Sequence, residues 1–225
     1  MPTSYLLKIT LKDMPKSIWR RFVVPSDIPL YKLHDVIQVV MGWDNSHLHV
    51  FIVGKQRYYP TMTLSDDFPD DLPEEDFTLA DVAGRKGTKI RYEYDFGDGW
   101  EHEIVVENTD YSNPDWPYPV YCMEGVRACP PEDCGGVGGY ANFCDAMADK
   151  KHPEHHELKE WYGDKFDPDH FDLAEVNKVL GVKPSKATKP PKKQAEPKPE
   201  TNESHELSKL GKKLKKAVEA SKKKK

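Results

Sequence analysis

Two alternating segments separated by a turn rich in glycine and aspartate constrain this chain more than any other feature. Over residues 90–96, apolar or aromatic side chains alternate with charged ones, which is the period-two pattern of a half-buried strand. Two glycines and two aspartates then break the pattern, and a second strand-like segment covers residues 100–107. The sequence therefore predicts a β-hairpin with Asp95, Asp98 and His102 near one acidic turn.

The remaining pattern within residues 1–182 mixes strands and helices. Strands are predicted at 4–11, 18–24 and 48–53, and helices at 30–41, 78–82, 140–148, 154–162 and 172–180. Residues 60–76 and 113–139 have the composition of loops, and a loop as long as the second is uncommon without a function. We therefore expect one α+β domain over residues 1–182, with a mixed or antiparallel sheet and flanking helices.

The charge of the chain is divided unevenly. Residues 183–225 contain 15 lysines, no arginine and five glutamates, a net charge of +10, whereas residues 1–182 carry a net charge of −15. The lysine-, proline- and glutamate-rich composition predicts a disordered basic tail, with a short amphipathic helix at 205–220 as one option. Such a tail could contact nucleic acid weakly through its charge, or could simply be solvated.

Four segments in the same order carry a family resemblance. They read IWRRFVVPSDIPLYKLHDVIQVVMGWDNSHLHVF at 18–51, YEYDFGDGWEHEI at 92–104, CMEGVRACPPEDCGGVGGYANF at 122–143 and EWYGDKFDPDHFD at 160–172. Together they resemble the plasmid pRiA4b open-reading-frame-three-like family, which is also described as an insertion-element passenger protein. The resemblance implies an α+β domain linked to mobile elements and implies no established biochemical role.

Histidines supply one candidate metal site. His47 and His49 are two residues apart on a predicted strand, so both imidazoles would lie on one face, about 7 Å apart. His102 could add a third ligand if its strand is a neighbour, and Asp44, Asp95 or Asp98 could complete or orient the site. The alternative is a pair of surface or hydrogen-bonded histidines, because the HxH pattern alone is weakly specific.

Cysteines supply a second candidate metal site. Cys122, Cys129 and Cys134 lie within one loop rich in glycine and proline, and could converge on a zinc ion. The chain has no CxxC pair, and Cys144 lies on a predicted helix, where a buried thiol is the ordinary interpretation. The sequence assigns no cofactor with certainty, and a divalent metal such as zinc is the candidate for either set.

A ligand cleft is predicted between the hairpin and the 113–139 loop. Its candidate lining residues are Trp43, Asp44, Asp95, Asp98, Trp100 and His102. The glycines of 130–139 could also cradle an anion, although Glu132 and Asp133 oppose a phosphate there, and a rigid packed loop is the alternative. The aspartates of the DFGDG turn could equally do no more than bond their own backbone.

Three functions follow from these features. The first is a non-enzymatic binding or accessory domain that recognises a protein, a peptide or a small polar ligand in the cleft. The second is a metal-dependent hydrolase-type enzyme that uses His47, His49 and His102, with Asp95 or Asp98 as base. The third is nucleic-acid binding through the tail.

The sequence has no apolar run that could span a membrane and no segment resembling an export signal, so we expect a cytoplasmic protein.

Overall fold

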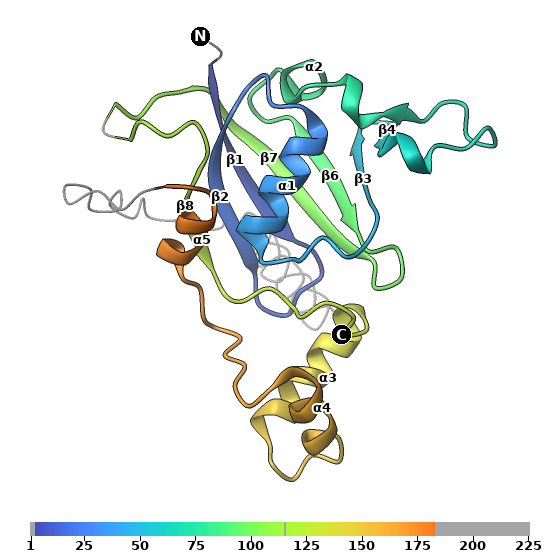
Figure 1. Cartoon of the computed structure of the whole chain (residues 1–225), viewed down its shortest axis with the longest axis vertical. Coiled ribbons are helices and arrows are strands. Elements are labelled where there is room, and N and C mark those ends of the chain that lie inside the picture. The colour runs from blue at the N-terminus through green and yellow to red at the C-terminus, as the bar shows by residue number, and fades with distance from the viewer. Residues whose placement is uncertain (1–2, 115, 183–225) are drawn as a thin grey trace, which may run out of the picture. The chain divides into compact units, whose positions relative to one another are not determined.

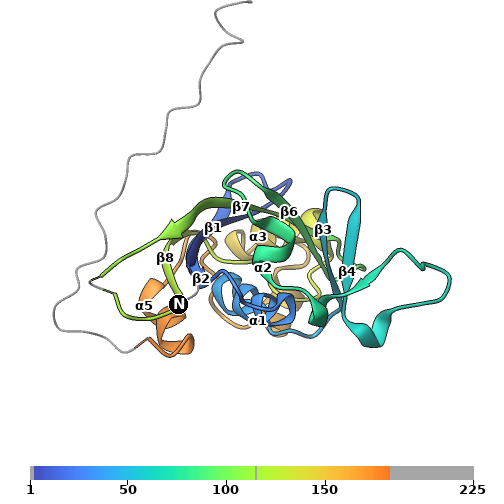
Figure 2. The same cartoon turned by 90° about the horizontal axis from the view of Figure 1, so that it is seen from above.

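The domain is built on one eight-stranded mixed sheet. A computed structural model describes residues 3–114 and 116–182. The strand order is β5-β4-β3-β6-β7-β1-β2-β8, and every neighbouring pair is antiparallel except β4 and β5. Helix α1 lies against one face of the sheet, and α3 and α4 lie beyond one end of it (Figures 1 and 2). This arrangement confirms the predicted α+β class.

The strands and helices have the following bounds. The strands are β1 (Ser4–Leu11), β2 (Ile18–Pro25), β3 (His49–Val53), β4 (Gln56–Tyr59), β5 (Leu72–Pro73), β6 (Lys89–Tyr94), β7 (Trp100–Tyr111) and β8 (Tyr121–Val126). The α-helices are α1 (Leu30–Met41), α2 (Leu79–Ala83), α3 (Gly136–Ala148), α4 (His155–Tyr162) and α5 (Leu173–Val179). Short 3₁₀ turns occupy Thr61–Thr63 and Glu74–Asp76.

Alternation along the strands separates a buried face of the sheet from a solvent-facing one. In β1 every second residue is buried, and in β6 Ile90, Tyr92 and Tyr94 are buried while Lys89 and Arg91 are exposed. The predicted hairpin is confirmed, because β6 and β7 pair from Lys89–Val105 to Tyr94–Trp100. The turn that joins them therefore projects from the end of the sheet near α3 (Figure 1).

Helix α1 covers the buried face and ends where it was predicted to end. Leu30, Leu33, Ile37 and Val40 are completely buried, as expected for an apolar stripe with helical spacing. Gly42 has φ +104° and donates its backbone N–H to the carbonyl of Gln38, which is the left-handed helix end that glycine favours. The chain then turns towards the candidate site.

The predicted loop 113–139 is more ordered than expected. Residues Tyr121–Val126 form β8 at the edge of the sheet beside β2, and α3 begins at Gly136 instead of residue 140. The strand has no period-two pattern in its sequence or burial. A Cβ on Gly125 would lie 2.6 Å from Cδ of Arg20, so contact with a residue distant in sequence requires glycine at this position.

Two further expectations concern the rest of the chain. The predicted basic tail, 183–225, and its proposed helix at 205–220 lie outside the described residues. Within the residues that are described, no helix combines the length and the apolar character that crossing a bilayer requires.

Candidate functional site

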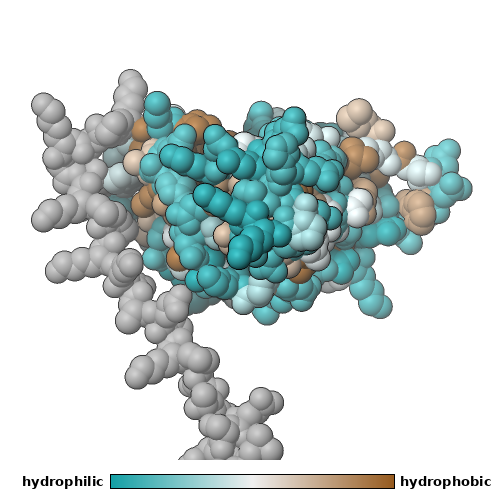
Figure 3. Space-filling model, turned by 90° about the horizontal axis from the view of Figure 1, so that it is seen from below, coloured by the Kyte–Doolittle hydropathy of each residue, from teal (hydrophilic) through white to brown (hydrophobic). Residues whose placement is uncertain are grey.

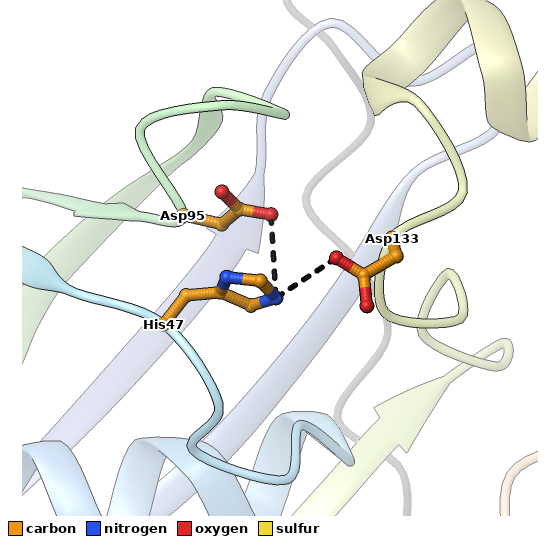
Figure 4. A group of neighbouring side chains, drawn as sticks. All are labelled: His47, Asp95 and Asp133. Carbon is orange, nitrogen blue, oxygen red and sulfur yellow. Dashed lines mark ion pairs between the residues drawn. The ribbon is translucent and has the colours of Figure 1, made fainter.

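Three segments that are distant in sequence meet at the end of the sheet near α3. They are the loop between α1 and β3, the turn between β6 and β7, and the segment between β8 and α3. Each contributes one of the side chains in Figure 4, namely His47, Asp95 and Asp133. Among the described residues, these three form the one group whose metal-ligating atoms all lie within 4.8 Å of one another.

The turn between β6 and β7 fixes Asp95 in an uncommon backbone conformation. Asp95 has φ +56°, which Asp and Asn tolerate better than most residues. Its backbone N–H donates to the Leu48 carbonyl at 2.9 Å, and its Oδ1 accepts from the N–H of Gly97 at 2.9 Å. Oδ1 therefore holds the turn, and Oδ2 faces the imidazole of His47.

Asp98 joins this turn to the start of α3. Its Oδ2 accepts the N–H of Gly135 at 3.0 Å, and a Cβ on Gly136 would lie only 2.6 Å from its backbone oxygen. The carboxylate of Asp98 therefore occupies the N-terminal end of α3, which is where a helix can bind an anion. The glycines at the start of α3 are needed for close packing against the turn.

Side chains of Glu132 and Tyr94 hold the loop that carries His47. The N–H of Asp44 donates to Glu132 Oε1 at 2.8 Å, and the N–H of Ser46 donates to the Tyr94 hydroxyl at 3.0 Å. That hydroxyl in turn donates to Glu132 Oε1 at 2.9 Å. The Ser46 hydroxyl donates to Asp44, and this bond lowers the pKa of the Asp44 carboxyl.

A buried network under α1 holds the same loop from below. The N–H of Asn45 donates to Gln38 Oε1 at 2.8 Å, and the Asn45 side-chain oxygen lies 2.7 Å from His34 Nε2. The other nitrogen of His34 lies 2.8 Å from the Tyr92 hydroxyl. Burial lowers the pKa of His34 to about 4, so its ring is neutral and Nε2 donates to Asn45.

The imidazole of His47 faces three carboxylates. Its Nε2 lies 3.2 Å from Asp133 Oδ1, 3.7 Å from Asp95 Oδ2 and 3.9 Å from Glu132 Oε2 (Figure 4 draws the first two contacts). Both His47 Nε2 and Glu132 Oε2 are buried and have no hydrogen-bond partner among the described residues. Buried polar atoms without partners are uncommon and call for an explanation.

The described residues place no lysine or arginine against the acidic side chains around His47. Within residues 3–114 and 116–182, none of the carboxylates of Asp44, Asp95, Asp98, Glu132 and Asp133 forms an ion pair with lysine or arginine. Burial raises the pKa of Glu132 above its ordinary value, which is the response expected of a partly desolvated carboxyl. A bound cation would compensate this charge directly.

The structure does not bring the three predicted histidines together. His49 Nε2 lies 2.8 Å from Glu74 Oε2, and its ring stacks on His34 with a centroid separation of 3.6 Å. His102 is completely buried, with Nδ1 3.0 Å from the Trp100 carbonyl and Nε2 3.4 Å from Trp43 Nε1. Each imidazole therefore has its own environment, and His47 alone reaches the carboxylate cluster.

The predicted cleft residues separate into two layers. Trp43, Trp100 and His102 are buried and in ring contact, with 5.5 Å between the centroids of the two tryptophans. They support the site from within the core. Asp95 and Asp98 belong to the cluster and its turn, as described above. Asp44 is exposed and meets Glu132 through its backbone.

The three predicted cysteine ligands do not gather around a common point. Cys122 lies on β8, with its Sγ 3.5 Å from the carbonyl of Arg21, and the three sulfurs do not form a group within 4.8 Å. Burial raises the pKa of Cys122 and of Cys134 to about 12, and that of Cys129 also lies well above the ordinary value. Without a bound metal ion these thiols are protonated.

Glu132 and Asp133 are partners of His47 that the sequence did not predict. Both stand in a loop rich in glycine and proline, where their acidic side chains predict only that phosphate is disfavoured. Asp133 has φ +55°, and together with Asn45 and Asp95 it makes three of the five non-glycine residues with positive φ in the described chain. Strained residues of this kind cluster at functional sites, but backbone angles are not visible in a sequence.

Comparison with known proteins agrees with this architecture. The protein is 37% identical over 181 residues to "Uncharacterized protein y4hQ" of Sinorhizobium fredii (strain NBRC 101917 / NGR234), covering 77% of this chain and 89% of that one. It is similar to the crystal structure of a protein of unknown function, MM3350 from Methanosarcina mazei Go1, with a TM-score of 0.67 and 33% identity over 77% of this chain and 97% of the other. The family model for the plasmid pRiA4b ORF-3-like protein matches residues 3–175, and the chain belongs to that family.

Proposed function

We propose that this domain binds a divalent cation through His47, Asp95 and Asp133 and uses it in a hydrolytic reaction. The observation that carries the proposal is the buried Nε2 of His47, which has no hydrogen-bond partner among the described residues and faces three carboxylates. The proposal keeps His47 and Asp95 from the sequence hypothesis. It replaces His49 and His102 with Asp133.

The spacing of the ligand atoms supports a shared cation. Two ligands bound to one metal ion at about 2.1 Å lie roughly 3.0 to 3.4 Å apart in octahedral or tetrahedral geometry. His47 Nε2 is 3.2 Å from Asp133 Oδ1 and 3.7 Å from Asp95 Oδ2, so small side-chain movements would complete the site. One nitrogen and two carboxylates suit Mn²⁺, Fe²⁺ or Zn²⁺.

The remaining groups suit hydrolysis. The Asp133 side chain is 70% exposed, so one side of the ion would stay open to water and substrate. A bound divalent ion lowers the pKa of its water. Glu132, with its raised pKa and one unpaired buried oxygen, can take a proton from water as the water oxygen bonds to the carbonyl carbon. It then returns that proton to the leaving group as the scissile bond breaks.

Calorimetric titration of the full chain with Mn²⁺ and Zn²⁺ tests the cation site. The protein should be purified without an affinity metal column. We expect one ion per chain with a dissociation constant below about 100 µM, and at least tenfold weaker binding by Asp133→Asn and Asp95→Asn. Asparagine tolerates the positive φ of both positions. Asp13→Asn is the matched control, because Asp13 also has positive φ, at 59°, in the turn between β1 and β2.

A turnover assay tests the hydrolytic part. With the metal bound, we expect cleavage of the neutral ester p-nitrophenyl acetate to fall at least a hundredfold in Glu132→Gln while metal affinity changes little. Failure to bind either ion, or equal affinity in Asp133→Asn and Asp13→Asn, would refute the cation site. Metal binding without turnover would refute the hydrolase and leave a cation-binding domain.

A further inference from the structure

Exposed apolar residues follow two residues of the proposed cation site in the sequence. Leu48 follows His47 and is 48% exposed, and Phe96 follows Asp95 and is 46% exposed. The carbonyl of Leu48 accepts the N–H of Asp95, so the two segments that carry these side chains are neighbours. Tyr59 packs edge-on against Phe96, with 6.3 Å between ring centroids. We call Leu48, Tyr59 and Phe96 the apolar shelf.

The shelf borders a strongly hydrophilic end of the domain. Figure 3 views the domain from this end: hydrophilic side chains dominate, and apolar side chains are visible in several places, among them the side on which β4 lies. Contiguous exposed apolar side chains rimmed by polar residues can mark a binding surface. A ligand long enough to extend from His47 past Leu48 around the end of the sheet can therefore contact an apolar surface as well.

The charge of the site restricts the ligand. Five acidic side chains gather here, those of Asp44, Asp95, Asp98, Glu132 and Asp133, and none has a lysine or arginine ion pair within the described chain. One divalent cation offsets only part of this acidic character, so a phosphate or another anion is repelled and a positively charged group is attracted. Nucleic acid is therefore a poor ligand for this end of the domain.

We propose that the ligand of this site is a polypeptide segment in which Lys or Arg stands beside an apolar residue. The basic side chain pairs with the carboxylates around His47, and the apolar neighbour lies on the shelf. This inference rests on the proposed function, which then acts on an amide: water adds across the bond, so the C–N bond breaks, the carbonyl carbon gains the hydroxyl and the amine nitrogen gains the proton. A polyamine would satisfy the charge but would leave the shelf uncovered.

Fluorescence anisotropy with three labelled octapeptides tests the recognition. The peptides alternate Lys with Leu, Lys with Ser, and Glu with Leu, and each is titrated with the full chain in the presence of Mn²⁺. We expect the Lys–Leu peptide to bind at least tenfold more tightly than the Lys–Ser peptide. Its affinity should fall as salt rises. Spermidine should displace it only at concentrations far above that of the unlabelled peptide.

Matched variants separate the shelf from other surfaces. Phe96→Ser should weaken the Lys–Leu peptide at least fivefold, and Asp44→Asn should weaken both lysine peptides. Val179→Ser is the control, because Val179 is 65% exposed on α5, which packs on β8 at the opposite edge of the sheet. The basic tail could bind the Glu–Leu peptide, but that binding should be insensitive to Phe96→Ser.

The outcomes distinguish this inference from the proposed function. Unchanged Lys–Leu affinity in both Phe96→Ser and Asp44→Asn would overturn the inference, even if the protein binds Mn²⁺ and cleaves the ester. Spermidine competing as well as the peptide would overturn the role of the shelf. Loss of metal binding with intact peptide selectivity would overturn the proposed function instead. Both substituted side chains are exposed, so neither substitution opens a cavity in the core.

Discussion

Replacing Arg20 with methionine should cost far more stability than the same change at Arg21. Arg20 is 1% exposed and uses all of its donors on backbone carbonyls, so it acts as a buried connector between β2, α1 and β8. Nε donates to the Val40 carbonyl at 2.8 Å, and Nη2 lies 3.4 Å from the Met41 carbonyl. These are carbonyls at the C-terminal end of α1, which a helix leaves without internal partners.

The other bonds of Arg20 extend to its own strand and to the chain after β8. Nη1 donates to the carbonyls of Trp19 at 2.9 Å and Val126 at 2.7 Å, and Nη2 donates to that of Arg127 at 2.7 Å. The guanidinium also stacks on Phe171 at 4.1 Å. Methionine keeps the apolar stem but leaves these buried acceptors unpaired. A hydrogen bond to a charged group contributes about 1.5 to 3 kcal/mol.

The net loss is smaller than the sum of five bonds because methionine also removes a buried charge. Burial lowers the pKa of Arg20, which records the cost of that charge. We expect a decrease of about 3 to 5 kcal/mol in the free energy of unfolding, because several buried carbonyls lose their donor at about 1 to 3 kcal/mol each while the cost of burying the charge is relieved. Arg21 is 22% exposed on its side chain and pairs with Glu107 and Glu124, so Arg21→Met should cost about 1 kcal/mol.

Urea unfolding followed by tryptophan fluorescence gives both values in one buffer. The m-value should stay constant, so the difference appears as a shift of the midpoint. Arg20→Lys should recover part of the loss, because an ammonium group keeps the charge but offers three donors in place of five. An Arg20→Met protein that is no less stable than Arg21→Met would refute the argument. The carbonyls of α1 and β8 would then be satisfied by water or by local rearrangement.

Two further predictions concern the start of α3 and the buried histidines. A Cβ on Gly139 would lie 1.9 Å from the Cys134 carbonyl oxygen, so Gly139→Ala should lower the free energy of unfolding in urea by about 2 kcal/mol or more. A Cβ on Gly138 would meet open space, so Gly138→Ala should be neutral or should stabilise by about 0.5 to 1 kcal/mol. Equal effects would contradict this. Burial lowers the pKa of His34 and of His102 to about 4, from about 6.5 in the unfolded chain. Between pH 6.5 and pH 4 the unfolded chain therefore binds more protons than the folded one, so the free energy of unfolding decreases as the pH is lowered. The two residues together account for up to about 2.7 kcal/mol per pH unit. Urea unfolding at pH 7, 6 and 5 should show this slope, and His34→Gln should remove about half of it; an unchanged slope in the variant would count against the assignment.

Much of the sheet was predictable from the sequence, because alternation reports which face of a strand is buried. The strands β1, β2, β6 and β7 and the helix α1 were expected at nearly their observed bounds. Strand β8 was not, since it pairs at the edge of the sheet and Gly125 accommodates the Arg20 side chain. Contacts between residues more than a hundred positions apart leave no local pattern. The edge strand therefore had to come from the structure.

The candidate site was predictable in part for a different physical reason. The hairpin pattern placed Asp95 at a turn, and the HxH pattern drew attention to His47. Which histidine faces the carboxylates depends on tertiary contacts, because His49 is taken by Glu74 and stacks on His34. Glu132 and Asp133 enter through a loop whose position is set by Asp98 on Gly135 and by Tyr94 on Glu132.

Hydrogen bonds to side chains of the surrounding fold hold the loop that carries His47. Three successive backbone N–H groups, those of Asp44, Asn45 and Ser46, donate to side chains from a loop, a helix and a strand, so the peptide that leads into His47 has little freedom. The loop loses its conformational freedom during folding, so ligand binding does not have to order it. Gln38 and Tyr94 are therefore positioning residues for His47, and weakening their bonds should reduce cation affinity before it reduces global stability.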